Sequence, residues 1–223
     1  MLTTPIESLR SYVDMPSGSF DQEDVQKVAE MFAQDFASLG FSTELIPGHQ
    51  FGPKLLARLG TGDKQLMLMG HMDTVFPRDT YVPFTPLEDN KALGSGSIDM
   101  KGGVVVMLYA LQKALPSLDL SKVRLTVLLN PDEEVGSPES HDLIYATAKE
   151  SFAALSFEPC GQEKRLTCAR KGVTAVEISC TGIPGHAGSK YKECASAIQA
   201  LCALITKLYT LRDDEKKSAL TPE

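Results

Sequence analysis

Apolar residues recur at helical spacing in several parts of this chain. The run from Val25 to Phe36 predicts a helix that begins near Asp21 and ends at Gly40. An earlier helix is indicated by Thr4-Pro5-Ile6-Glu7, a capping box with proline at the first helical position. The remaining predicted helices cover residues 103–115, 140–150 and 195–211.

Between these helices, short apolar runs predict strands. They cover residues 42–46, 54–59, 65–69, 123–129 and 153–157. Strands that alternate with helices are typical of an α/β fold, so we expect a mixed, mostly parallel sheet with flanking helices. The pattern changes at about Lys171, where residues 173–180 alternate as a half-buried strand. We therefore predict one domain over residues 1–170 and part of a second over residues 171–223.

A histidine and several acidic residues stand where the predicted strands end, or in the glycine-rich turn before the helix at 103–115. In chain order they are His71, Asp73, Asp99, Glu133, Glu134 and Glu158. The carboxyl ends of parallel strands gather along one edge of a sheet, so these segments can converge on a metal ion. One imidazole with several carboxylates suits zinc or another borderline divalent ion better than a thiolate site would.

Each of these features also has a simpler interpretation. A single His-x-Asp pair, such as His71 and Asp73, is more often a surface or turn feature than a metal site. Gly94-Ser95-Gly96 could cradle a phosphate, but it precedes an acidic residue and lacks the full dinucleotide fingerprint. His49 and His141 are predicted to be solvent-exposed residues with no role in the metal site. The repeated placement of acids at successive strand ends is what favours the metal site.

Six motifs in a fixed order resemble those of the M20 family of zinc-dependent metallopeptidases, and most closely its glutamate carboxypeptidase branch. They are GHMDTV at 70–75, GSGSIDMKGG at 94–103, NPDEEVGS at 130–137, SFEP at 156–159, RKGV at 170–173 and GIPGHAG at 182–188. The resemblance covers essentially the whole sequence. It implies a zinc-peptidase-like catalytic domain, followed by the first half of a ferredoxin-like α+β lid and dimerisation domain.

The resemblance also implies a site for two zinc ions, with cobalt or manganese as substitutes. His71 and Glu158 would bind one ion, Glu134 would bind the other, and Asp99 would bridge the two. A carboxylate suits the bridging position because it offers one oxygen to each ion.

Three further roles come with the resemblance. Glu133 would be the general base that takes a proton from the nucleophilic water, and Asp73 would hold His71 in the correct tautomer. His186 would reach the active site of the partner in a homodimer and stabilise the oxyanion, unless it is an ordinary turn histidine. The family often has a cis peptide after its bridging aspartate, so one is expected between Asp99 and Met100.

The function implied is hydrolysis of an amide bond next to a free carboxylate in a small peptide, with release of a C-terminal glutamate or similar residue. An N-acyl amino acid deacylase or a dipeptidase is the alternative on the same scaffold. The sequence ends at Glu223, and its last histidine is His186, before the point where the family supplies a final zinc histidine. A fragment of a longer enzyme, or a shortened and catalytically impaired remnant, is therefore the other expectation.

Composition and net charge exclude some classes of binding partner. The chain has 223 residues, a formal net charge of −7 and no basic cluster, which argues against nucleic acid. No apolar run has the length of a signal peptide or a membrane span, so we expect a cytoplasmic protein that does not bind membranes. The five cysteines lie between Cys160 and Cys202 without C-x-x-C spacing. They are predicted to be reduced and mostly buried.

Overall fold

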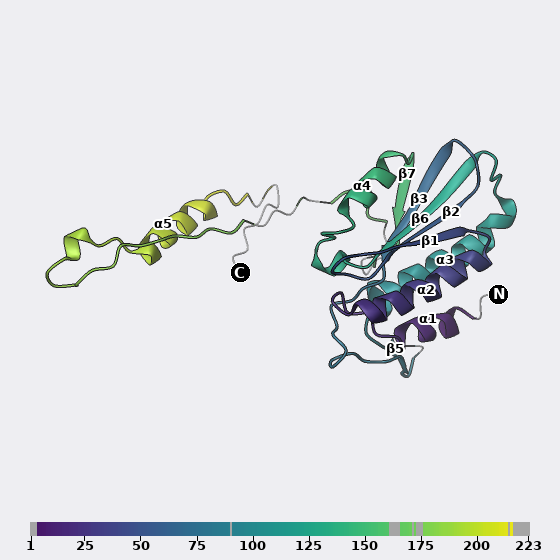
Figure 1. Ribbon diagram of the computed structural model, residues 1–223, viewed down its shortest axis with the longest axis horizontal. Coiled ribbons are helices and arrows are strands. Elements are labelled where there is room, and N and C mark those ends of the chain that lie inside the picture. The colour runs from purple at the N-terminus through teal and green to yellow at the C-terminus, as the bar shows by residue number, and fades with distance from the viewer. Residues whose placement is uncertain are drawn as a thin grey trace. The chain divides into compact units, whose positions relative to one another are not determined.

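The computed structural model describes residues 4–89, 91–160, 166–170, 172, 176–213 and 215. They belong to two compact units, Met1–Leu166 and Thr167–Glu223 (Figure 1). The units are described separately below, and the candidate metal centre lies in the first of them.

A five-stranded mixed sheet forms the middle of the first unit. Its strands, in spatial order, are β1 (Ser42–Ile46), β2 (Lys54–Leu59), β6 (Val123–Asn130), β3 (Lys64–His71) and β7 (Ala153–Ser156). β1 and β2 are antiparallel, as are β2 and β6, whereas β3 is parallel to both β6 and β7. The predicted α/β fold with a mixed sheet is confirmed, and its parallel part consists of β6, β3 and β7. A separate hairpin of β4 (Thr85–Pro86) and β5 (Ala92–Leu93) was not predicted.

Helices cover both faces of this sheet (Figure 1). One face packs against α2 (Gln22–Ser38) and α3 (Gly102–Ala114), with α1 (Pro5–Val13) packed against α3, and α4 (His141–Lys149) covers part of the other face. Alternation along the strands explains this division, because successive side chains point to opposite faces. Leu55 and Ala57 of β2 enter the larger core, while Leu56 between them enters the smaller core beneath α4.

The local signals at helix ends act as predicted. The Thr4 hydroxyl and the Glu7 side chain form both bonds of the capping box at the start of α1. Gly40 follows α2 with a φ of +94°, a left-handed conformation that costs glycine little. The α1 and α2 boundaries therefore follow directly from the sequence.

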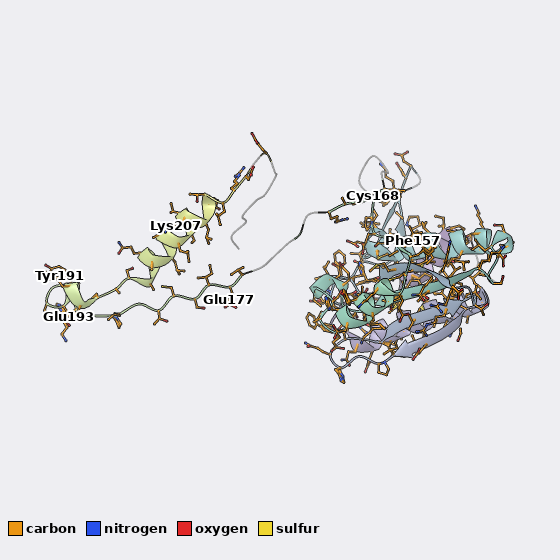
Figure 2. All side chains as sticks on the ribbon, turned by 90° about the horizontal axis from the view of Figure 1, so that it is seen from above. Phe157, Cys168, Glu177, Tyr191, Glu193 and Lys207 are labelled. Atoms are coloured by element: carbon orange, nitrogen blue, oxygen red, sulfur yellow. The ribbon has the colours of Figure 1, made fainter. Side chains whose placement is uncertain are left out.

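The second unit departs further from expectation. Its helix α5 (Ala197–Tyr209) forms as predicted, yet none of its residues is buried, and side chains such as Lys207 stand clear of the ribbon (Figure 2). Residues 176–180 are not a strand, and residues 173–175 of that predicted strand lie outside the described residues. None of the five cysteines forms a disulfide, but four are exposed and Cys194 is half-buried, so the prediction of mostly buried thiols is wrong. No helix in the described ranges is long and apolar enough to cross a membrane.

Candidate metal centre

Three parallel strands end side by side at one edge of the sheet, and the predicted site residues follow them. His71, the last residue of β3, pairs in register with Asn130, the last residue of β6. On the other side, Met69 pairs with Ser156 at the end of β7, two residues before Glu158. The chain therefore brings the segments of His71, Glu133 and Glu158 together because β6, β3 and β7 end at the same level.

His71 is the buried centre of the group, with 1% of its side chain exposed. Its Nδ1 lies 3.0 Å from the Asp73 carbonyl oxygen and 3.3 Å from Asp73 Oδ1. Its Nε2 faces three acids, at 3.1 Å from Asp99 Oδ1, 3.8 Å from Glu158 Oε1 and 3.9 Å from Glu133 Oε2. A proton held on Nδ1 by Asp73 would leave the Nε2 lone pair directed at the acids, as a metal ligand requires.

His71, Asp99 and Glu158 together form a group able to hold a metal ion. Each offers one ligand atom, and these atoms all lie within 4.8 Å of one another. The three side chains differ in exposure. His71 is 1% exposed, whereas 53% of the Asp99 side chain and 31% of the Glu158 side chain are exposed. One imidazole and two carboxylates suit a divalent cation chemically, and neighbouring acids could complete the coordination.

The loop that carries Asp99 is a short segment between Gly96 and the start of α3. Residues Ser97–Lys101 form a single wide helical turn, in which Asp99 and Met100 have non-helical backbone angles. The peptide bond between Asp99 and Met100 is cis, as the resemblance implied. Met100 is fully buried, and its sulfur accepts a hydrogen bond from the His71 backbone N–H at 3.0 Å. The loop that carries Asp99 is therefore fixed directly to the end of β3.

Asp73 has a wider role than the sequence indicated. Besides facing His71, its Oδ1 accepts the backbone N–H of Glu133 at 3.2 Å, and its Oδ2 accepts that of Glu134, also at 3.2 Å. The Ser19 hydroxyl donates to the same Oδ2 at 2.7 Å. Asp73 is completely buried, so one carboxylate orients the imidazole and both glutamates. Ser19 lies 54 residues earlier in the chain, and no motif indicated it.

A second buried carboxylate, Asp132, shapes the turn that carries Glu133 and Glu134. It accepts the backbone N–H groups of Glu139 at 2.8 Å and Ser140 at 3.1 Å, together with the Ser140 hydroxyl at 2.5 Å. The Asn130 amide donates to it at 3.1 Å. The NPDEE motif contains Asp132, but its spacing gave no indication that this acid faces inward while the next two face the site.

Charge in the group shifts the pKa values of its members. Burial opposes the imidazolium of His71, but the hydrogen bond to Asp73 and the charges of Asp73, Glu158 and Glu133 outweigh it and raise the pKa to about 9. Burial, followed by the charges of Asp99 and Glu133, raises the pKa of Glu158 to about 6 against the effect of His71. Burial is also the main reason that the pKa of Glu134 is raised, and the charge of Asp99 adds to it. An excess of close carboxylates of this kind favours a bound cation.

Two of the other histidines, His49 and His141, are in the first unit but are not members of the group around His71. Both are exposed, as predicted. His186 belongs to the second unit, where its Nδ1 accepts the backbone N–H groups of Gly188 and Ser189 at 3.1 and 3.2 Å. Its assignment to the active site stays a prediction.

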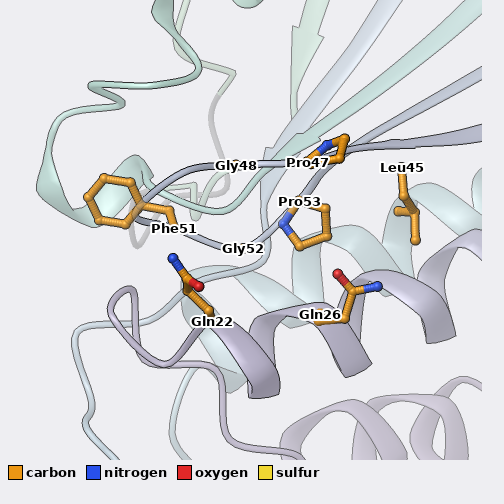
Figure 3. Close-up of a pocket in the computed structure, with 8 residues that line it drawn as sticks. All are labelled: Gln22, Gln26, Leu45, Pro47, Gly48, Phe51, Gly52 and Pro53. Atoms are coloured by element: carbon orange, nitrogen blue, oxygen red, sulfur yellow. The ribbon is translucent and has the colours of Figure 1, made fainter.

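A shallow pocket lies between α2 and the loop that joins β1 to β2 (Figure 3). Its lining consists of Gln22, Gln26, Leu45, Pro47, Gly48, Phe51, Gly52 and Pro53. None of these residues has an acidic, basic or nucleophilic side chain. The pocket therefore offers no group for hydrolysis, in contrast to the edge of the sheet at His71.

Comparison with known proteins relates the chain to one family. The model of peptidase family M20/M25/M40 matches residues 67–221. Carboxypeptidase G2 from Pseudomonas sp. (strain RS-16) is 33% identical over 95% of this chain and 52% of its own length. Acetylornithine deacetylase from Proteus mirabilis (strain HI4320) is 34% identical over 95% of this chain and 56% of its own length. The chain thus spans about half the length of the curated relatives it matches.

Solved structures support the fold. Aminopeptidase PepT from Bacillus cereus ATCC 10987 matches 91% of this chain and 56% of its own chain, with a TM-score of 0.64 at 18% identity. The M20 family metallo-carboxypeptidase Sso-CP2 from Sulfolobus solfataricus matches 70% of this chain and 37% of its own, with a TM-score of 0.58 at 21% identity. At these identities the likeness concerns the fold alone.

Proposed function

Because the chain belongs to peptidase family M20/M25/M40, we propose that it is part or all of a metal-dependent hydrolase that cleaves an amide bond next to a free carboxylate. One observation carries the proposal. The Nε2 atom of His71 faces Asp99 and Glu158, while the Glu133 carboxylate lies close by at 3.9 Å with 48% of its side chain exposed. A ligand group beside an accessible acid is the arrangement that metal-assisted hydrolysis requires.

The ligand roles that we propose are those implied by the resemblance to the family. His71 and Glu158 would hold one ion, Glu134 would hold a second, and Asp99 would contribute one carboxylate oxygen to each. Divalent metal ions, when bound, polarise a scissile carbonyl and acidify water at neutral pH. Zinc is the ion we propose, because it accepts imidazole together with carboxylate oxygen and keeps an open position in catalytic sites.

The side chains of the protein would then perform the proton transfers. Glu133 would accept a proton from the attacking water and deliver it to the leaving amine, because its carboxylate lies near the ligand group but outside its closest cluster. Asp73 would hold the proton on His71 Nδ1 and fix the backbone of Glu133. In a homodimer, His186 would stabilise the oxyanion by donating a hydrogen bond.

The substrate class rests on the two curated relatives. A carboxypeptidase and an acetyl amino acid deacetylase both cleave an amide whose nitrogen belongs to an amino acid. We therefore propose a small peptide that loses its C-terminal residue as the first candidate substrate. An N-acyl amino acid is the second, supported by 34% identity to the deacetylase over 95% of this chain.

Metal content and hydrolysis test the proposal together. The purified chain is dialysed against a zinc-buffered solution, and the zinc bound per chain is measured before and after chelation. The same samples are assayed with dipeptides ending in glutamate and with matched N-acetyl amino acids. We expect two zinc ions and chelator-sensitive release of the free amino acid. Zinc-loaded protein that cleaves neither class would contradict the proposed function, and one ion per chain would limit it to a half-site of His71, Asp99 and Glu158.

A further inference from the structure

Lys101 is a fully buried basic side chain that the proposed reaction does not use. It is 0% exposed, and its Nζ donates to the carbonyl oxygens of Tyr12 at 3.0 Å and Met15 at 2.6 Å and to the Tyr81 hydroxyl at 2.9 Å. These three partners match the three donors of an ammonium group. Within the described ranges, no carboxylate pairs with it. Burial lowers the pKa of this amine to about 7 against the charge of Asp24, so the retention of a lysine at this position needs an explanation.

The partners of Lys101 connect the Asp99 loop to the end of another helix. Tyr12 and Met15 lie at the C-terminal end of α1, where helix carbonyls lack intrahelical partners and the helix dipole favours a cation. The Tyr81 hydroxyl, which accepts from Lys101, lies 3.0 Å from the Met15 carbonyl oxygen and 3.1 Å from that of Ser95. The ammonium therefore links α1, the Tyr81 segment and the start of the Asp99 loop.

The same residue also closes the loop itself. Its backbone N–H donates to the Gly96 carbonyl oxygen at 3.0 Å. Gly96 has a φ of +69°, and a β-carbon there would come within 2.5 Å of the Thr74 side chain. Asp99 is thus an exposed carboxylate followed by two fully buried residues, Met100 and Lys101. Met100 fixes the loop to β3, and Lys101 fixes it to α1.

We infer that Lys101 is a positioning residue of the metal centre, whose ammonium holds the Asp99 loop against the end of α1 so that the Asp99 carboxylate stays beside His71. The inference rests on the proposed function, because it gives Asp99 the role of a metal ligand. It adds a residue that has no contact with metal or substrate. Partners outside the ligand set commonly change metal affinity by about 10–100-fold when they are lost.

Lys101→Met tests this inference, since it keeps an unbranched side chain only one atom shorter and removes all three donors. The matched control is Lys54→Met, which makes the same change at another buried lysine, on β2. Zinc affinity is measured by competition with a chromogenic chelator, and thermal unfolding and circular dichroism report the fold. We expect Lys101→Met to lose about 10–100-fold in zinc affinity and Lys54→Met to lose less than about threefold.

Tyr81→Phe keeps the test decisive if Lys101→Met does not fold. It removes only the hydroxyl that Lys101 shares with α1 and Ser95, and we expect a loss of about three- to tenfold in zinc affinity. If both residues act as one unit, the double variant should lose about as much as Lys101→Met alone. Unchanged zinc affinity in a folded Lys101→Met, or in Tyr81→Phe where Lys101→Met is unfolded, overturns the inference.

The measurement separates this inference from the proposed function. Wild-type chain that binds zinc but cleaves no substrate overturns the proposed function and leaves the role of Lys101 to be judged from affinity. Wild-type chain that binds no zinc overturns both. Equal losses in Lys101→Met and Lys54→Met would show only general destabilisation, and would overturn the positioning role.

Discussion

Two layers of the candidate metal centre differ in how they meet solvent. His71 and Asp73, which we call the floor, are 1% and 0% exposed, and hydrogen bonds to the backbone fix them. Asp99, Glu133 and Glu158, which we call the rim, are 53%, 48% and 31% exposed. The floor provides a rigid orientation, whereas the rim can exchange water and substrate. This difference predicts that floor substitutions affect metal binding and stability, and that Glu133 on the rim affects chemistry alone.

The largest effect is expected on the rim. Glu133→Gln keeps the size of the side chain but removes its basicity, so hydrolysis should fall by roughly 10²–10⁴-fold with zinc affinity unchanged. Steady-state rates and zinc content check both parts. The control is Glu134→Gln, the same change one residue later, which should lower zinc occupancy. Loss of zinc in Glu133→Gln, with occupancy kept in Glu134→Gln, would show that the roles of the two glutamates are reversed.

The next effect concerns proton competition at the floor. In the metal-free chain the pKa of His71 is raised to about 9, so its imidazole is protonated at neutral pH and must release that proton to bind metal. Zinc affinity should therefore rise about tenfold per pH unit between pH 7 and 9 and then level off. The same shift stabilises the metal-free fold below the ordinary histidine pKa, and this contribution is lost as the pH rises through about 9.

Calorimetry tests this directly. Zinc titrations at pH 7.5 in buffers of different ionisation enthalpy should show about one proton released from His71 per bound zinc ion. An affinity that does not change between pH 7 and 9, measured with chelator-buffered zinc, would show that His71 is already neutral and that the acids around it do not hold its proton.

A third prediction concerns the carboxylate beneath the histidine. Asp73→Asn removes the negative charge that faces His71 Nδ1 and weakens the acceptor for two backbone N–H groups and Ser19. Zinc affinity should fall by about 10–100-fold, and its rise with pH should become shallower because the pKa of His71 is no longer raised by Asp73. Zinc competition at two pH values measures both changes.

The control for this variant is Asp24→Asn. Asp24 is also a buried carboxylate, but it pairs with Arg78 and Lys27, and in the described structure it forms no ion pair or hydrogen bond with His71 or Asp73. The Asp24→Asn substitution should lower the melting temperature of the protein without changing its zinc affinity. Equal zinc losses in the two variants would show that a buried charge matters only for stability, and the distinction between floor and rim would not hold.

The sequence predicted the regular elements that local rules determine. β1 and β2 begin and end where their apolar runs do, and α1 begins at its capping box. Five of the six predicted metal-centre residues of the first unit lie at or just after the ends of β3, β6 and β7, because parallel strands bring their carboxyl ends together, and Asp99 comes from the turn before α3. The resemblance implied a role for each, but only the fold brings His71, Asp99 and Glu158 within reach of one ion.

The supporting contacts could not be predicted, because they join segments far apart in sequence. Ser19 meets Asp73 across 54 residues, and Lys101 meets Tyr12 across 89. Serine and lysine are usually exposed, so nothing in the composition marks these two as buried.

The strand predicted over residues 173–180 failed for the opposite reason, because the sequence pattern was present but the strand did not form. Its alternation is a real pattern, but a strand needs a partner, and residues 176–180 are paired with none in the described part of the chain.

The smallest effect should come from Ser19→Ala, which removes the side-chain hydrogen bond from Ser19 to Asp73 of the floor. The hydroxyl donates to Asp73 Oδ2 at 2.7 Å in a buried setting, and a hydrogen bond to a charged group contributes about 1.5–3 kcal/mol to stability. The neighbouring Ser17 is buried too, but its hydroxyl has no hydrogen-bond partner in the described structure. Ser17→Ala should therefore be nearly neutral, while Ser19→Ala should lower the free energy of unfolding measurably and zinc affinity by less than about tenfold. Because both variants remove one buried hydroxyl, the difference between them isolates the bond to Asp73. Equal unfolding free energies for the two would show that the backbone N–H groups of Glu133 and Glu134 hold Asp73 without Ser19.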